Sequence, residues 1–73
     1  MSYIDIKSKT ISLIEYDDTN NKLNVIFSKK PEVVYSYIQV PKEVFNTLLL
    51  SENKDKFFSH SISKNYQFNI WQK

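Results

Sequence analysis

The chain contains no glycine among its 73 residues. Glycine adopts a positive φ most readily, and Asn and Asp are the next most tolerant residues. Every turn that needs a positive φ must therefore use Asn or Asp in this chain. The strongest turn signal is segment 17–21, Asp-Asp-Thr-Asn-Asn, which separates two runs rich in β-prone residues. The sequence therefore predicts a polar hairpin turn at this point.

The short length is the second constraint, because it predicts one small domain over residues 1–73. Ordering such a chain costs nearly as much free energy as burial returns. The core must therefore use most of the 11 aromatic residues and the 18 Val, Ile and Leu residues. Little apolar material is left to line a deep substrate cavity, so any function is expected on the surface.

The composition indicates a compartment and a source. Cysteine is absent, which excludes disulfides, thiolate metal sites and a cysteine nucleophile, and favours a reducing cytoplasm. The N-terminus has no basic-then-apolar signal pattern, and no apolar stretch is long enough to span a bilayer. Gly, Ala and Arg are all missing while Lys, Asn and Ile supply 25 residues, a bias typical of AT-rich coding in a low-GC bacterium or a phage.

Three strands are expected, at about residues 9–16, 22–28 and 33–40. Leu23, Val25 and Phe27 fall on one face at every second position, and Asn24 points the other way, as in a half-solvated antiparallel strand. In the first strand, the adjacent Leu13 and Ile14 interrupt the alternation, which indicates either a bulge or a two-sided strand.

Two helical segments should follow the strands. Pro41 suits a helix start, the apolar stripe of Val44, Phe45, Leu48 and Leu49 predicts an amphipathic helix, and Asn53 is expected to end it in the left-handed conformation. Further on, Phe57, Phe58 and Ile62 fit a short helix, and the alternation of Tyr66, Phe68 and Ile70 is compatible with a short last strand. The expected fold class is α+β, with a three-stranded antiparallel meander followed by an amphipathic helix and a short C-terminal helical segment. Its expected core is Val25, Phe27, Ile14, Val44, Leu48, Phe58 and Ile62.

Residue patterns for catalysis or cofactor binding are weak. The single histidine, His60, has Asp55 and Ser59 nearby in sequence, but adjacency does not build a relay, and an exposed or capping role is the simpler interpretation. The acidic group Glu15, Asp17 and Asp18 fits a polar turn better than a calcium loop. We therefore expect no enzyme activity, no catalytic residues, no metal, no cofactor and no small-molecule substrate.

Aromatic and basic residues suggest a binding surface instead. Tyr35 and Tyr37 lie on one face of a strand, which suits either a base-stacking platform or a wall of the core. Residues 53–73 carry four lysines and one acid, net +3, whereas residues 1–52 carry six lysines and seven acids, net −1. In the basic part, Lys54, Lys56 and Lys64 lie among aromatic residues, as phosphate attraction combined with stacking would need. A solvated face whose aromatic residues close the core remains the alternative.

The order of these motifs resembles the KTSC family over about residues 10–68. The resemblance rests on Tyr35-x-Tyr37, on Val40-Pro41-x-x-Val44-Phe45-x-x-Leu48-Leu49, and on Lys56-Phe57-Phe58 followed by Ile62 and Tyr66. KTSC domains occur at the C-terminus of some lysyl-tRNA synthetases and as stand-alone bacterial and phage proteins. This linkage implies RNA binding, with Lys56 as the basic residue before the aromatic pair. The chain departs from the family pattern at Asp55, Ser59 and Ser63, where glycine, asparagine and arginine are common.

Two functions from different classes follow. The first is a small cytoplasmic, non-enzymatic module that binds RNA or another nucleic acid through Tyr35, Tyr37, Lys54, Lys56 and Lys64. The alternative is a protein–protein interaction module, or a phage-encoded inhibitor of a host protein, which an exposed apolar patch or an open strand edge would support. The expected partner is thus RNA or a host protein, and not a membrane.

Overall fold

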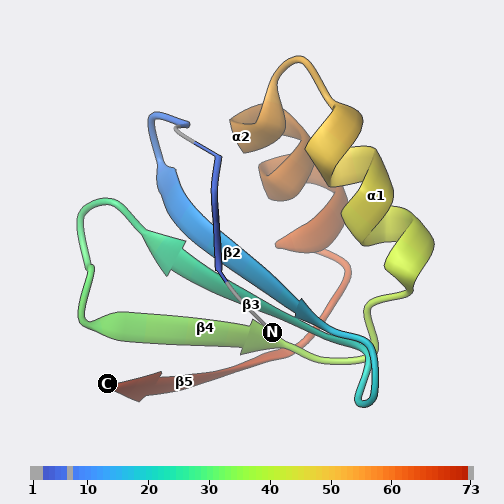
Figure 1. Cartoon of the computed structure of the whole chain (residues 1–73), viewed down its shortest axis with the longest axis horizontal. Helices are drawn as coiled ribbons and strands as arrows, with labels where there is room; N and C mark the ends of the chain where they lie inside the picture. Colours follow the sequence, from blue (N-terminus) through green and yellow to red (C-terminus); the bar gives the residue numbers. More distant parts are fainter. Residues whose placement is uncertain (1–2, 7, 73) are drawn as a thin grey trace.

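The computed structural model describes residues 3–6 and 8–72. Within them the elements are, in chain order, β1 (Ile4–Asp5), β2 (Ile11–Asp17), β3 (Lys22–Phe27), β4 (Val33–Tyr37), α1 (Lys42–Leu50), α2 (Lys54–Phe57), a π-helical turn η1 (Phe58–Ile62) and β5 (Phe68–Gln72). The strands form one antiparallel sheet in the order β1-β2-β3-β4-β5, and the helices cover one of its faces (Figure 1).

The expected three-stranded meander is wrong, because this sheet has five strands. The predicted hairpins β2–β3 and β3–β4 are present, but β1 and β5 extend the sheet at its two sides. β1 pairs with β2 through only two residues, Ile4 and Asp5, whereas β5 pairs with β4 along its whole length. The fold is α+β with a larger sheet than expected: the short last strand indicated by the alternation of Phe68 and Ile70 is present as β5, whereas β1 is too short to leave a local pattern.

A bulge in β2 resolves the irregular alternation of the first predicted strand. The register with β3 shifts between Ile11 and Leu13, so that Ser12 has no directly opposite partner. An extra residue changes the side on which the following residues lie. As a result, Ile11 and Ile14 both face the core, although they are three residues apart, and both are fully buried.

The core lies between the sheet and the helical layer. α1 buries Phe45 and Leu48, and η1 buries Phe58 and Ile62. The helical residues pack on the inner face of the sheet, where the buried side chains are Ile11, Ile14, Tyr16, Leu23, Val25 and Tyr37. Five of the seven expected core residues are buried, and the other two, Phe27 and Val44, pack against the core while partly exposed.

Asn53 has a different role from the expected one. α1 ends at Leu50, followed by Ser51 with a φ of −69°, and Asn53 has a φ of −119° rather than a left-handed value. Its Oδ1 accepts a hydrogen bond of 3.1 Å from the backbone N–H of Lys56. Asn53 therefore begins α2 as its N-cap, a position at which an Asn side chain satisfies a helical N–H that has no other backbone partner.

Among the described residues, two adopt a positive φ, and neither is glycine: Asn21 has a φ of 54° and Gln39 a φ of 56°. The first confirms that Asn replaces glycine in the hairpin turn. Gln39 was not expected, because glutamine tolerates this conformation less well. Its neighbours hold it in place: the Ile38 N–H donates to the Gln67 carbonyl at 2.9 Å, and the Val40 N–H donates to the Asn21 carbonyl at 2.8 Å. Such strain persists where the surroundings fix the backbone on both sides.

Replacing Gln39 by glycine should therefore raise the free energy of unfolding by up to about 1 kcal/mol. A left-handed residue with a Cβ costs roughly 1–2 kcal/mol, and the extra chain entropy of glycine offsets about half of that gain. Urea unfolding followed by Trp71 fluorescence measures the change. Asn46→Gly, at an exposed site inside α1, is the matched control and should lower stability. Equal losses in both variants would contradict the strain at Gln39.

Candidate interaction surface

The outer edge of the sheet at β5 is the most apolar exposed feature of the described chain. β5 is an edge strand, and all five of its residues are exposed. Among the large apolar residues that are exposed, three lie on this strand: Phe68 at 43%, Ile70 at 57% and Trp71 at 48%. Within residues 3–6 and 8–72, no strand or helix lies beyond β5, which is drawn in dark red at the lower edge of Figure 1.

The register of β5 shows which backbone groups face outward. The Ile38 N–H donates to the Gln67 carbonyl, and the pairing continues with Tyr37 opposite Phe68. In an antiparallel pair, residues alternate between those bonded to the neighbouring strand and those whose N–H and C=O point away from it. Continuing the alternation from Gln67, the N–H and C=O groups that point away from β4 belong to Phe68, Ile70 and Gln72.

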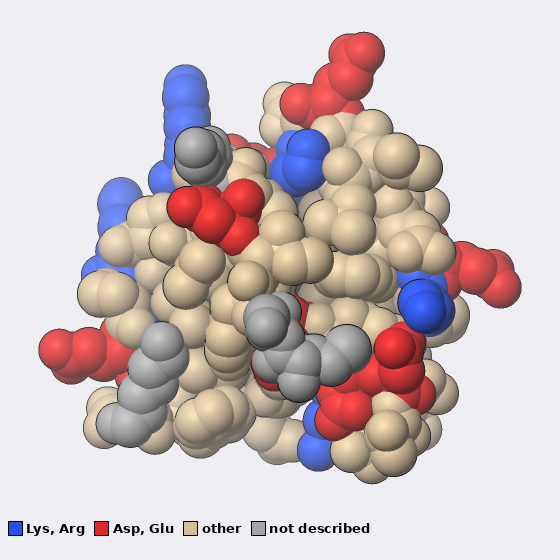
Figure 2. Space-filling model, in the orientation of Figure 1, with Lys and Arg blue, Asp and Glu red and all other residues tan. Residues whose placement is uncertain are grey.

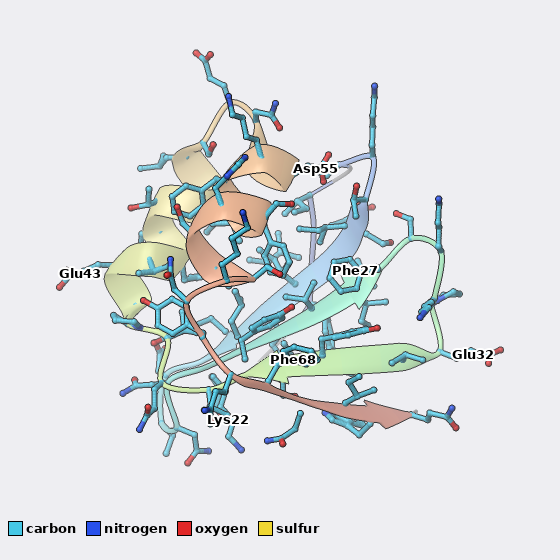
Figure 3. The ribbon with its side chains drawn as sticks, turned by 180° about the vertical axis from the view of Figure 1, so that it is seen from behind. Lys22, Phe27, Glu32, Glu43, Asp55 and Phe68 are labelled. Atoms are coloured by element: carbon cyan, nitrogen blue, oxygen red, sulfur yellow. The ribbon has the colours of Figure 1, made fainter. Side chains whose placement is uncertain are left out.

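Side chains on both faces of the sheet hold β5 against β4. On the helical face, the Phe68 ring lies 5.4 Å from Tyr35 and 5.1 Å from Tyr37, measured between ring centroids. Figure 3 shows Phe68 on the same side of the sheet as Phe27. On the opposite face, the Trp71 Nε1–H donates to the Ser36 hydroxyl at 2.8 Å. β5 is thus held in place by its inner neighbour while its outer edge stays open.

The bond from Trp71 to Ser36 is the last in a row of side-chain hydrogen bonds across four strands. This row, formed by Trp71, Ser36, Asn24 and Glu15, is called the polar ladder. The Ser36 hydroxyl donates to Asn24 Oδ1 at 2.6 Å, and Asn24 Nδ2 donates to Glu15 Oε1 at 3.1 Å. Because cross-strand partners share a face, the ladder lies on the side of the sheet opposite the helices. These bonds join β2, β3, β4 and β5 in one register.

The predicted tyrosine pair lies on the inner face of the sheet. Tyr37 is 3% exposed and packs edge-on against Phe58, with ring centroids 5.2 Å apart. Tyr35 is partly buried and packs edge-on against Phe27 at 4.8 Å. Both rings contact Phe68, so the pair forms a wall of the core. In this arrangement, the Tyr37 ring has no free face on which a base could stack.

Buried tyrosines should make the fold sensitive to alkaline pH. Burial raises the pKa of Tyr16 above its ordinary value of 10.0, and the charges of Asp18 and Asp17 raise it further. Burial also raises the pKa of Tyr37, against the opposing effect of a hydrogen bond with Ser63. The folded chain therefore holds these protons more tightly than the unfolded chain does. The resulting stability is present below about pH 10 and is lost as the pH rises further.

Urea unfolding measured at about pH 9 and about pH 11 should show this loss. Tyr37→Phe removes one of the groups with a raised pKa, so the variant should lose less stability between these pH values than the native chain. An identical loss in both proteins would contradict a contribution from Tyr37.

Of the three predicted lysines, Lys54 and Lys56 line one groove and Lys64 lies outside it. Lys54 and Lys56 line an open groove of about 650 Å³ between α2 and the segment before β2, together with Lys9 and His60. Lys54 Nζ donates to the Ser51 carbonyl at 3.0 Å, whereas Lys56 is exposed. Lys64 is exposed in the turn after η1 and does not line this groove.

On the face in Figure 2, lysines and acids are scattered in small groups over a mostly uncharged surface. The nucleic-acid role of these five residues stays a prediction.

Asp55 also lines this groove and connects α2 to the segment before β2. Its carboxylate accepts hydrogen bonds of 3.2 Å from the backbone N–H groups of Lys9 and Thr10. Figure 3 shows Asp55 on α2 beside the chain that leads into β2. The acid that replaces the common glycine of the family pattern therefore joins the helical layer to the sheet. It also places a negative charge among the lysines of the groove.

The remaining candidate residues are His60, which lies at the groove, and Asp17, which lies at the end of β2. His60 is exposed at the rim of the groove. Asp17 accepts hydrogen bonds from the Asn20 side chain at 2.9 Å and from the backbone of Thr19 at 3.0 Å, and the Asn20 side chain is the main reason that the pKa of Asp17 is lowered. Over residues 3–6 and 8–72, no three side chains of His, Asp or Glu are grouped as metal ligands would be. In the same ranges, no helix is both long and apolar enough to cross a membrane.

Sequence reasoning did not identify the β5 edge as a site. It grouped Phe68 and Trp71 with the lysines of the C-terminal third. The signal that distinguishes them is the run from Asn65 to Gln72, which alternates in part and carries no charge. Its exposure depends on pairing with β4, about 35 residues earlier in the chain, which a local pattern does not reveal.

Comparisons with known proteins add a family and a fold. The sequence model of the KTSC domain matches residues 7–66, a range that ends just before β5. A comparison with curated proteins found no match. The chain is similar to the crystal structure of a KTSC domain protein from Yersinia pestis, with a TM-score of 0.85 and 22% sequence identity. That similarity covers 99% of this chain and 96% of the other one, and at such identity it shows a shared fold.

Proposed function

Because the chain belongs to the KTSC domain family, we propose that it is a small non-enzymatic binding module, and that its β5 edge accepts an extended segment of a partner protein. Strand addition of this kind combines backbone hydrogen bonds along the edge with side-chain contacts on alternate residues. β5 lies outside the matched range 7–66, so the proposal concerns this chain rather than the whole family.

The observation that carries the proposal is the coincidence of open backbone and exposed apolar side chains. Phe68, Ile70 and Gln72 direct N–H and C=O groups away from β4, and Phe68, Ile70 and Trp71 are all more than 40% exposed. Small proteins usually protect such an edge with charges, prolines or bulges. A partner strand would satisfy the backbone groups and cover apolar surface in the same step.

A library of eight-residue peptides displayed on phage tests strand addition directly. Selected peptides should alternate apolar and polar residues and should slow amide hydrogen exchange at Phe68, Ile70 and Gln72. Ile70→Pro should abolish their binding, because proline removes an N–H that faces the partner and not β4. The control is Leu50→Lys, at an 85% exposed site on α1. Selected peptides that bind Ile70→Pro as tightly as the native chain would contradict the proposal.

RNA binding remains a second candidate because Lys9, Lys54, Lys56 and His60 line one groove. Fluorescence anisotropy with a labelled single-stranded RNA, at about 50 mM and about 200 mM salt, measures the phosphate contribution. Lys56→Ala and Lys9→Ala should each weaken binding and reduce its salt dependence, because both lysines line the groove. Lys42→Ala is the control, since Lys42 pairs with Asp18 on the β2–β3 hairpin at 3.4 Å. Undetectable binding at low salt, or binding that neither substitution changes, would remove this candidate.

A further inference from the structure

We infer that β5 pairs with β5 of a second copy of this chain, antiparallel about a two-fold axis at Ile70, so that two sheets join into one. The inference rests on the proposed function, because it names the strand that occupies the open edge. It follows from three features of β5: its lack of edge protection, its symmetry in the antiparallel register, and its neutrality.

The two edges of the sheet differ in how far they are protected. Over the residues that the structure describes, β1 pairs through two positions, one of them the acidic Asp5, and a short charged edge offers little to a further strand. β5 is five residues long, and the segment from Asn65 to Gln72 has no charge and no proline. Among the described strands, β5 is therefore the edge that can add a strand of comparable length.

The outward groups of β5 match those of a second β5 in one register. With the axis at Ile70, Phe68 lies opposite Gln72 of the second copy, and the two Ile70 residues lie opposite each other. These are the residues whose N–H and C=O groups face outward, so each opposite pair can exchange two backbone hydrogen bonds. If the axis lay one residue away, at Asn69, Phe68 would lie opposite Ile70 of the second copy. Gln72 would then have no partner within β5 of that copy.

The same register also matches side chains on both faces. On the helical face, the two Ile70 side chains meet across the axis and Phe68 meets Gln72 of the second copy. This pairing removes apolar surface of Phe68 and Ile70 from water. On the opposite face, Trp71 meets Asn69 of the second copy. Cross-strand partners share a face, so the pairing continues the inner and outer surfaces of each sheet.

The neutrality of β5 favours a second copy over a charged partner. The other 65 residues contain all 18 charged side chains of the chain, and the eight residues from Asn65 to Gln72 contain none. A strongly acidic or basic segment finds no opposite charge along this edge, whereas a second β5 brings an equally uncharged, apolar strand. Symmetric pairing also places no like charges opposite each other along the strand, although each chain carries a net charge of +2.

Sedimentation velocity over a range of concentrations tests the pairing, with variants at the axis. The native chain should approach the mass of a dimer as its concentration rises. Ile70→Lys and Ile70→Glu should each raise the dissociation constant at least about tenfold, because like charges then face each other across the axis. An equimolar mixture of the two variants should regain the dimer, since a lysine then faces a glutamate. Residue 70 is 57% exposed, so both substitutions should be tolerated by the fold.

The matched control is the same pair of charges at Leu50, which is 85% exposed on α1. Leu50→Lys and Leu50→Glu should dimerise like the native chain, alone and mixed. A dimer that persists in both Ile70 variants, or a mixture that does not regain it, would overturn the pairing at Ile70. A native chain that stays monomeric at every concentration would also overturn it. The phage-selected peptides then decide the proposed function separately, because a monomer that binds them at β5 retains an open edge for another protein.

Discussion

Replacing Phe58 by alanine should lower the free energy of unfolding by about 3–5 kcal/mol. Phe58 is 4% exposed and joins η1 to the sheet through edge-on contacts with Phe27 at 5.6 Å and Tyr37 at 5.2 Å. Removing a buried Phe side chain costs about 3–5 kcal/mol. A domain of this length has a total stability of roughly 4–11 kcal/mol, so the loss is a large part of it.

The measurement for Phe58→Ala is urea unfolding, followed by far-ultraviolet circular dichroism and by Trp71 fluorescence. Phe57→Ala is the matched control, because Phe57 precedes Phe58 in the chain but is only partly buried. It should cost about half as much or less, in proportion to the smaller area that it buries. Similar losses at the two positions would mean that Phe58 is not the main contact between η1 and the sheet.

The importance of Phe58 could be predicted from the sequence, because local spacing carries it. Phe58 and Ile62 are four residues apart, which places them on one side of a helical segment, and both are buried. The helix that starts after Pro41 shows the same kind of signal, with Leu48 buried at the expected place. Within a helix, 3.6-residue periodicity reports the buried face without knowledge of the partner.

The sequence could not predict features that depend on a distant partner. Period-two alternation placed Tyr35 and Tyr37 on one face but could not show which face the helices cover. β1 is two residues long, too short for any pattern, and the alternation that indicated β5 did not show that this strand would pair with β4. Gln39 adopts a positive φ because hydrogen bonds on both sides fix its neighbours. The position of each of these residues is set by tertiary contacts rather than by propensity.

The polar ladder on the outer face is the clearest such case, and it yields the last prediction. Asn24 donates to Glu15 on one side and accepts from Ser36 on the other. Asn24→Asp keeps the shape and the bond from Ser36, but it replaces the amide donor with a second carboxylate facing Glu15. The loss of a partly buried hydrogen bond together with this repulsion should lower the free energy of unfolding by about 1–3 kcal/mol near neutral pH.

The loss in Asn24→Asp should shrink as the pH falls toward about 4, because two adjacent carboxyls then share one proton and a hydrogen bond forms again. The sign follows from proton binding: the folded variant binds this proton more tightly than the unfolded variant, so acid favours folding relative to the native chain. Urea unfolding of both proteins across this range gives the difference in the free energy of unfolding.

The double variant Glu15→Gln with Asn24→Asp should recover most of the stability at neutral pH, since the new amide on β2 then donates to the new carboxylate on β3. A double variant as unstable as Asn24→Asp alone would show that the Glu15–Asn24 bond does not support the sheet, and that Ser36 and Trp71 hold β5 without the rest of the ladder.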